Sequence, residues 1–169
     1  LWHLNQNIPR IAIMLGYAYA VAGRTDEAIP LLILANERVR SLGWHLTEAQ
    51  LIQGFLLVGK SQEASLRASR ALESSRHHGQ LSREAWALYG QGEIASATNQ
   101  LSDGAEASLR AAMVIGSKLH MRPLVAHCNV ALGKLYRQTG DRRLATQYFG
   151  DGIAMMRQMG MGLWLERAE

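Results

Sequence analysis

The chain has 169 residues, which is enough for one ordinary domain and too few for two large ones. Ala and Leu make 47 residues whereas Val, Ile and Thr make 20, and this favours helices because β-branched side chains are crowded there. The net charge of +4 is shared evenly by the two halves, so no basic tail points to nucleic acid as a partner.

Membrane and oxidising environments are also disfavoured. No apolar run approaches the roughly 20 residues that cross a bilayer, so no membrane partner is expected. The single cysteine, Cys128, cannot form an internal disulfide, and we therefore expect a cytoplasmic location. Because the first residue is Leu1 instead of Met, we expect the chain to be a piece of a longer protein.

The predicted helices follow one another in pairs. The first helix of each pair is expected near residues 9–22, 46–58, 82–98 and 122–138. The second helix of each pair is expected near residues 26–41, 61–77, 102–118 and 141–158. A ninth helix is expected to start near Leu163.

The first and last pairs carry the same residue pattern. Both Leu15–Tyr19 and Leu132–Tyr136 begin with Leu-Gly and place a Tyr three residues after the Gly. Further shared positions, seven and twelve residues after that Gly, are Gly23 and Ala28 in the first copy and Gly140 and Ala145 in the last. The offset of 117 residues equals three periods of 39, which predicts two more copies between them.

Both intermediate copies can be found. The second copy consists of Leu51, Phe55, Gly59 and Ala64. The third copy consists of Gly92, Ala95 and Ala105, with one extra residue in its turn near residues 99–102. This period exceeds the common one of about 34 residues, which implies slightly longer helices.

Each position in the pattern has a packing reason. A small residue at Gly16 and Gly133 is expected where the first helix meets the second, because a side chain would push the two helices apart. The large groups expected to fill the space between helices are Tyr19, Phe55 and Tyr136. The small residues expected to let the second helix lie close are Ala28, Ala64, Ala105 and Ala145. The residues expected to end the first helices, in a left-handed conformation that needs no Cβ, are Gly23, Gly59 and Gly140.

The pattern is identified as that of the tetratricopeptide repeat (TPR). It predicts an all-α fold, a right-handed superhelical solenoid of about four helix-turn-helix repeats that forms a single domain over residues 1–169. The expected repeats cover approximately residues 9–43, 44–80, 82–120 and 122–160, and residues 161–169 start a capping helix.

A narrower resemblance rests on several runs of residues: Leu15–Gly23, Ala85–Leu88, Gly92–Ala95, Met121–Cys128, Leu132–Gly140 and Met159–Glu166. These runs resemble the C-terminal TPR tail of large bacterial regulators that carry a class III adenylate or guanylate cyclase domain and an AAA-like ATPase. Similar helical tails occur in large transcription activators with a related ATPase. The resemblance implies that catalysis belongs to other parts of the parent protein.

No catalytic, cofactor-binding or metal-binding residue is expected in this chain, and we expect it not to be an enzyme. The sequence contains no G-x-x-x-x-G-K-[ST] phosphate loop. His127 and Cys128 are adjacent, so on a helix they point about 100° apart and cannot act as a dyad. The methionines at 155, 156, 159 and 161 are expected to form a core seam for the next helix, with a soft partner surface as the alternative.

The concave face of a TPR solenoid is where partners usually bind, and the repeat register predicts which side chains line it. The expected groove residues are Arg10, Tyr17, Gln53, Trp86, Tyr89, Glu93, His127, Lys134, Arg137 and Gln138. The register leaves open whether the aromatic members are exposed to a partner or packed internally.

Two functions are consistent with these features. The first is a regulatory scaffold that binds protein, either upstream domains of the same parent or another protein. An acidic partner surface would suit the basic residues of 122–143, which are Arg122, Lys134, Arg137, Arg142 and Arg143. The alternative is a sensor domain that binds a small ligand. A homodimer is also expected, through apolar faces near the two ends: Leu1, Trp2 and Leu4, and Met159, Met161, Leu163, Trp164 and Leu165.

Overall fold

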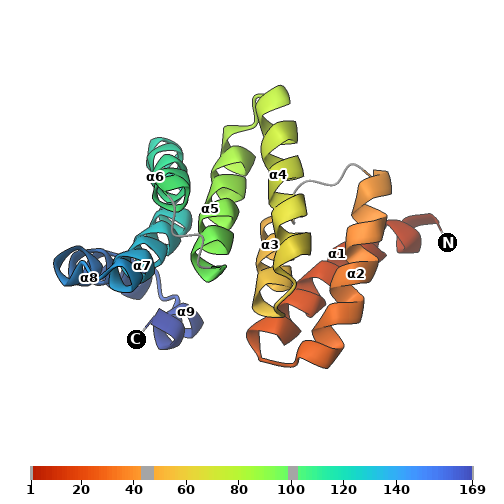
Figure 1. Cartoon of the computed structure of the whole chain (residues 1–169). Helices are drawn as coiled ribbons and strands as arrows, with labels where there is room; N and C mark the ends of the chain where they lie inside the picture. Colours follow the sequence, from red (N-terminus) through yellow and green to blue (C-terminus); the bar gives the residue numbers. More distant parts are fainter. Residues whose placement is uncertain (1, 43–47, 99–102, 169) are drawn as a thin grey trace. The chain divides into compact units, whose positions relative to one another are not determined.

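The computed structural model describes residues 2–42, 48–98 and 103–168, and every regular element in these ranges is an α-helix (Figure 1). The all-α prediction is therefore confirmed for the described part of the chain. In chain order the helices are α1 (Trp2–Val21), α2 (Thr25–Leu42), α3 (Glu48–Leu57), α4 (Ser61–His77), α5 (Leu81–Ala97), α6 (Asp103–Lys118), α7 (Arg122–Thr139), α8 (Arg142–Gln158) and α9 (Gly162–Ala168).

The helix boundaries agree with the predicted ones to within two residues, except at the start of α1. The predicted start near residue 9 is wrong, because α1 begins at Trp2 and contains Pro9. Proline is commonest in the first turn of a helix, where its missing N–H leaves no intrahelical bond unmade. Here the Pro9 ring is buried, and this packing offsets the lost hydrogen bond inside the helix.

The chain divides into two compact units, residues 1–71 and residues 72–169, and the boundary falls inside α4. The single domain expected over residues 1–169 stays a prediction. The turn predicted near residues 99–102 lies outside the described residues, as does Leu1, and no side chain of residues 1–7 is described, which includes Trp2 and Leu4.

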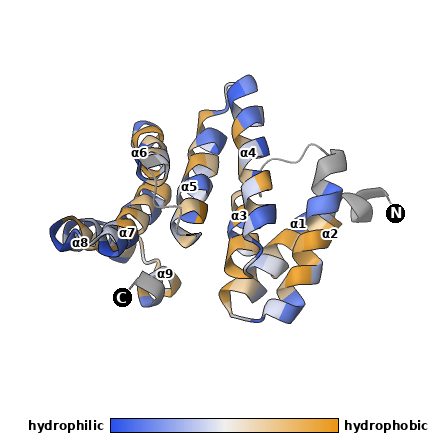
Figure 2. Ribbon diagram, in the orientation of Figure 1, coloured by the Kyte–Doolittle hydropathy of each residue, from blue (hydrophilic) through white to orange (hydrophobic). Residues whose placement is uncertain are grey.

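In the first unit, α1, α2 and α3 pack against one another around Leu32. A Cβ added at Gly16 would lie 3.1 Å from Leu32 Cγ, and one added at Gly54 of α3 would lie 2.8 Å from Leu32 Cδ2. Leu32 therefore fills the space between two other helices. The predicted filler Phe55 is fully buried, whereas Tyr19 is only half-buried and has the Arg24 guanidinium 4.4 Å above its ring. Figure 2 shows mainly hydrophobic colours on all three helices.

In the second unit, α5 packs on α6, α6 on α7, and α7 on α8. Two close approaches repeat the one at Gly16: a Cβ at Gly92 would lie 2.5 Å from Leu109 Cγ, and one at Gly133 would lie 2.9 Å from Phe149 Cγ. Most of the buried side chains form one cluster across α5, α6 and α7, and Tyr136 belongs to it as predicted. The predicted small residues Ala28, Ala64, Ala105 and Ala145 are buried in their respective units.

A second cluster joins α7, α8 and α9. Its buried members are Ala126, Val130 and Met156. The side chains packed against them are Phe149, Met155, Met159, Met161, Trp164 and Leu165. The methionines therefore form a core seam against α9, as predicted. Four of the residues expected to form a free apolar face near the C-terminus, Met159, Met161, Trp164 and Leu165, pack in this cluster instead. Leu163 remains 54% exposed.

The predicted glycine turns are confirmed at three positions. Gly23, Gly59 and Gly140 have φ angles of 75°, 75° and 89°. At Gly140 this left-handed residue ends α7, and the next residue caps α8, because the Leu144 backbone N–H donates to Asp141 Oδ1 at 2.9 Å. The chain can therefore reverse direction between α7 and α8 within three residues.

The close approach at Gly92 predicts a strong effect of a single methyl group. Gly92→Ala places its Cβ 2.5 Å from a side-chain carbon of Leu109 and 3.2 Å from the Ala105 carbonyl oxygen. We expect a loss of about 1–3 kcal/mol in the free energy of unfolding, measured by urea denaturation.

Gly150→Ala is the matched control, because Gly150 is also helical but a Cβ there would have no neighbour within 4 Å. We expect it to stabilise the chain by about 0.5–1 kcal/mol, the usual gain of Ala over Gly in a helix. Equal effects of the two substitutions would contradict the packing described for α5 and α6.

Candidate interaction groove

The predicted groove residues of the first unit lie on α1 and α3. The Tyr17 hydroxyl donates to Gln53 Oε1 at 2.8 Å, and both side chains are half-buried. Tyr17 and Gln53 stand two residues after Leu15 and Leu51, which are equivalent in the repeat pattern. The hydrogen bond therefore joins equivalent positions of two successive first helices. Arg10 is exposed on α1, about two helical turns before Tyr17.

In the second unit, three predicted groove residues form an aromatic cluster with a fourth from α9. The centroids of the Trp86 and Tyr89 rings are 5.8 Å apart, and the His127 ring lies 6.2 Å from Trp86 and 5.9 Å from Tyr89. Trp164 packs edge-on against His127 with a centroid distance of 4.8 Å. These separations and tilts are those of favourable aromatic contacts.

The aromatic residues are mostly packed internally, which answers the question that the repeat register leaves open. Tyr89 is only 4% exposed, whereas Trp86, His127 and Trp164 are half-buried. Burial, together with a smaller contribution from the charge of Lys134, lowers the pKa of His127 to about 4. His127 is therefore neutral at neutral pH and acts as an aromatic packing group.

Cys128 is a buried structural residue. It is fully buried, and burial raises the pKa of its thiol to about 12, with a smaller contribution from the Glu93 carboxylate. The thiolate that nucleophilic or metal chemistry requires is thus strongly disfavoured. Over the described ranges, His, Cys, Asp and Glu residues form no group of three or more that could hold a metal ion.

The charged residues predicted for the groove are spread along α5 and α7. Glu93 and Lys134 are half-buried, and each shifts the pKa of a neighbouring residue, the buried Cys128 and the half-buried His127 respectively. Arg137 is exposed, and its guanidinium lies 5.4 Å from the centre of the Phe149 ring of α8. Gln138 is exposed beside it at the end of α7.

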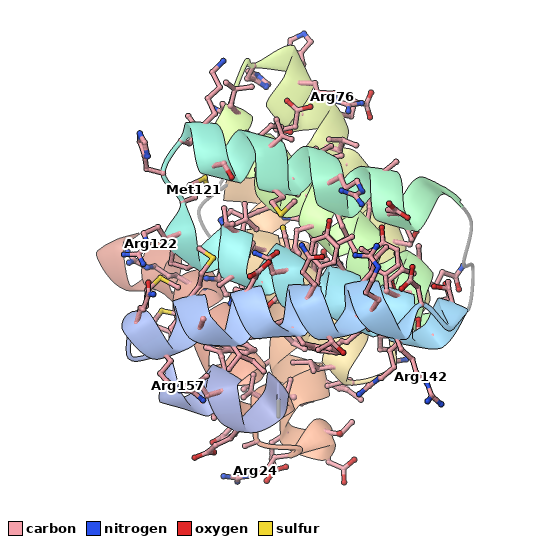
Figure 3. All side chains as sticks on the ribbon, turned by 90° about the vertical axis from the view of Figure 1, so that its left-hand side faces the viewer. Arg24, Arg76, Met121, Arg122, Arg142 and Arg157 are labelled. Atoms are coloured by element: carbon pink, nitrogen blue, oxygen red, sulfur yellow. The ribbon has the colours of Figure 1, made fainter. Side chains whose placement is uncertain are left out.

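The basic residues of 122–143 do not form one patch. Arg137, Arg142 and Arg143 are exposed around the turn between α7 and α8. Arg122 begins α7, about 22 Å along the helix axis from Arg137, and its Nη2 donates to Gln158 Oε1 at 2.9 Å. Figure 3 shows Arg122 near the end of α8 that bears Arg157, and Arg142 at the opposite end. The turn is therefore the compact basic site.

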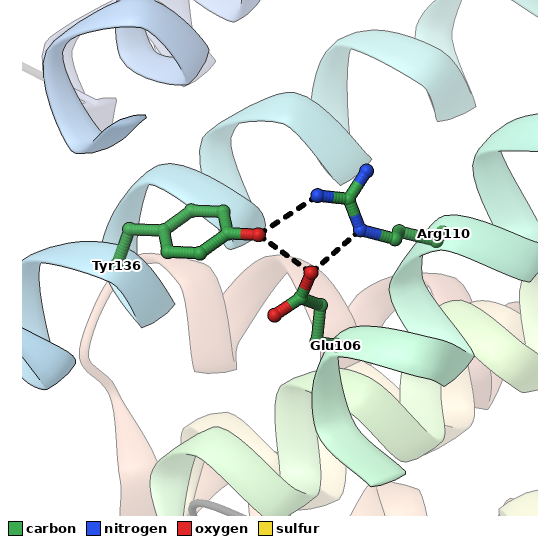
Figure 4. Close-up of polar contacts among 3 residues, drawn as sticks. All are labelled: Glu106, Arg110 and Tyr136. Atoms are coloured by element: carbon green, nitrogen blue, oxygen red, sulfur yellow. Dashed lines mark hydrogen bonds and ion pairs between the residues drawn. The ribbon is translucent and has the colours of Figure 1, made fainter. Parts of the chain in front are cut away.

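A polar contact that sequence reasoning missed joins α6 to α7 (Figure 4). The Tyr136 hydroxyl donates to Glu106 Oε1 at 2.6 Å and accepts from Arg110 Nη2 at 2.8 Å, while Arg110 Nε donates to the same Glu106 oxygen at 2.6 Å. The Tyr136 ring also stacks on Tyr148 of α8, with centroids 5.4 Å apart. The i, i+4 spacing of Glu106 and Arg110 in the sequence could have predicted an ion pair between them, but it does not predict that Tyr136 joins this pair.

The electrostatics of this contact are those of a structural clamp. The hydrogen bonds from Tyr136 and then Arg110 hold the pKa of the Glu106 carboxyl below its usual range. Burial, followed by the hydrogen bond to Glu106, raises the pKa of the Tyr136 phenol, so its proton stays on the oxygen that donates it. The contact fixes the α6–α7 packing and offers no free acid or base.

No protein-family model and no curated protein matches the sequence. The family resemblance therefore stays a prediction from the residues. Among the helices that the structure describes, none is both long and apolar enough to cross a membrane.

The neutral state of His127 predicts a stability loss on mild acidification. The unfolded chain protonates this histidine near pH 6.5, whereas the folded chain resists protonation until about pH 4. Stability from this group is thus complete above pH 6.5 and falls as the pH drops through that window, by up to about 3 kcal/mol. His127→Phe keeps an aromatic ring without a titrating group, and the difference in unfolding free energy between the two chains should shrink or reverse from pH 7 to pH 4. A difference that stays constant over this range would contradict the buried, neutral histidine.

The clamp at Glu106 predicts a specific role for one hydroxyl. Tyr136→Phe removes the donor to Glu106 and the acceptor for Arg110 while keeping the stacked ring, and we expect a loss of about 1 kcal/mol in thermal or urea unfolding. Tyr148→Phe is the matched control, since it removes a hydroxyl from the other ring of the stack, and it should cost clearly less. Equal losses would show that the hydroxyl of Tyr136 has no special role.

Proposed function

We propose that the chain is a non-catalytic scaffold that binds protein, built from about four TPR-like repeats in a right-handed solenoid and belonging to a larger bacterial signalling protein of the cyclase or ATPase type. One observation carries the proposal: equivalent residues of distant helix pairs make the same contact. Gly16 meets Leu32, Gly92 meets Leu109, and Gly133 meets Phe149. The separations are 16, 17 and 16 residues, and the longer one occurs in the pair with the extra turn residue.

A second regularity supports the same repeat. On each second helix, the residue equivalent to Leu32 has small residues four positions before it and three positions after it, and these small residues are buried. The four sets are Ala28, Leu32 and Ala35; Ala64, Ala68 and Ala71; Ala105, Leu109 and Ala112; and Ala145, Phe149 and Gly152. Recurrence of a whole packing face is expected when neighbouring units stack in a regular array.

The side chains favour binding over catalysis. His127 and Cys128, which have the most reactive groups of the predicted groove region, are both held uncharged by burial. The groups left exposed are mainly polar and cationic, with Arg137, Arg142 and Arg143 around one turn. Such a site suits an acidic protein surface. A single, buried Cys128 also fits the cytoplasmic location that we propose.

The basic turn provides the test of this function. Arg142→Glu with Arg143→Glu should weaken binding of the parent's upstream domains, or of a purified partner, and should flatten the dependence of the affinity on salt. The matched control is Arg70→Glu with Lys118→Glu, which changes the net charge equally at exposed sites on other helices. Isothermal titration at two salt concentrations measures both effects.

Two outcomes would overturn the proposal. An affinity that ignores both pairs of substitutions and the salt concentration would exclude the basic turn. A small metabolite that raises the melting temperature would favour the sensor function, because a ligand at about 100 times its dissociation constant adds about 2.7 kcal/mol of stability.

A further inference from the structure

Methionines are concentrated where the last described helix joins α8. Four of the seven methionines lie within residues 155–161, at the end of α8 and in the turn that leads to α9. All four belong to the cluster that joins α7, α8 and α9, in which Met156 is buried. Met155, Met159 and Met161 are half-buried, so solvent reaches part of each side chain. The junction therefore combines packing contacts with accessible methionines.

The turn from α6 to α7 is equivalent to the turn from α8 to α9. His120 and Gly160 both have positive φ angles, of 55° and 67°. The backbone N–H groups of Met121 and Met161 each donate to the carbonyl oxygen five residues earlier, at 2.8 and 3.0 Å. A shift of 40 residues thus superimposes one turn on the other.

This equivalence shows that the turn does not require methionines. Ile115 stands at the position of Met155, and Leu119 stands at the position of Met159. Ile115 packs against the cluster across α5, α6 and α7, so an aliphatic side chain fits the same place. A thioether adds chemistry that an aliphatic side chain lacks, because its sulfur can accept an oxygen atom.

The position of α9 depends on contacts with the rest of the chain. The helix has seven residues, too few for a helix that is stable on its own. Trp164 and Leu165 pack in the methionine cluster, whereas Leu163 is 54% exposed. Trp164 also packs edge-on against His127 of α7, with ring centroids 4.8 Å apart. A more polar group in the cluster would therefore weaken the packing that holds α9.

We propose that Met159 and Met161 form a peroxide-sensitive modification site, at which oxidation to sulfoxides detaches α9 from α7 and α8. The sulfur lone pair attacks one oxygen of hydrogen peroxide, the O–O bond breaks and an S–O bond forms. Sulfur loses two electrons, and the other oxygen leaves as water with both protons of the peroxide. The polar sulfoxides no longer suit the cluster that contains Trp164 and Leu165, and this favours separation of the helix.

Met155 differs from the two turn methionines because a hydrogen-bond donor lies beside it. Asn129 Nδ2 is 3.8 Å from the Met155 sulfur and also donates to the Val125 carbonyl oxygen at 3.0 Å. Asn129 is only 7% exposed, so its amide can donate to a sulfoxide oxygen at Met155 within the cluster. The proposal therefore assigns the effect to the methionines on either side of Gly160. It does not depend on the proposed binding function.

Peroxide treatment of the chain, followed by proton NMR of the His127 ring at about pH 8, tests this site. Histidine is neutral at this pH whether it is buried or exposed, so its signal reports the neighbouring Trp164 ring. His127→Phe identifies the signal by its loss, and Trp164→Leu gives its position without the indole ring. Oxidation should move the signal of the unsubstituted chain to that position, and methionine sulfoxide reductases should return it.

Leucine variants test which methionines are responsible. Met159→Leu with Met161→Leu should keep α9 in place and abolish the response, because leucine has a similar volume and resists this oxidation. The matched control is Met14→Leu with Met121→Leu, which removes an exposed methionine of α1 and the equivalent of Met161 in the preceding turn. This control should respond as the unsubstituted chain does. Peptide mass spectrometry identifies the oxidised methionines at each peroxide dose.

Three results would overturn the proposal. The first is a His127 signal that stays in place once Met159 and Met161 are oxidised. The second is an equal response of the variant that lacks both methionines, and the third is their resistance at doses that oxidise Met14, which is 58% exposed. None of these results would alter salt-dependent binding at the basic turn, so failure of this site is distinguishable from failure of the proposed function.

Discussion

Three helix pairs of this chain, α1–α2, α5–α6 and α7–α8, close where the first helix has a glycine at the crossing point. At Gly16, Gly92 and Gly133, an added Cβ would lie between 2.5 and 3.1 Å from the nearest side-chain carbon of the second helix. Real Cβ atoms rarely tolerate such distances, so the backbones approach more closely than an alanine would allow. This close approach stabilises the folded chain through dispersion contacts between the paired helices. Leu32 and Leu109, which lie opposite Gly16 and Gly92, are completely buried.

The remaining interactions depend on this spacing. Once α1 and α2 are close, Leu32 also reaches Gly54 of α3, and Tyr17 comes within hydrogen-bonding distance of Gln53. In the second unit the Glu106–Arg110–Tyr136 clamp joins α6 of one glycine-governed pair to α7 of the next.

Local signals account for the part of the structure that the sequence predicts well. Glycine turns and the period of apolar residues placed most helix boundaries, because each depends on residues close in the chain. Contacts between distant residues were harder to predict. The aromatic cluster required knowledge that α9 brings Trp164 onto His127, and the clamp required the orientation of Tyr136 relative to α6. Neither orientation is encoded in spacing alone, and the start of α1 was missed because Pro9 obscures the turns before it.

A double-mutant cycle at the α5–α6 crossing tests the central claim most directly. Leu109→Ala removes the side chain that an added methyl group at Gly92 would strike. If close approach governs the pair, the chain with both substitutions should be more stable than the sum of the single losses predicts, by about 1 kcal/mol or more. The same cycle with Gly150→Ala should be additive, since that site has open space around it. Additive losses in both cycles would contradict the account.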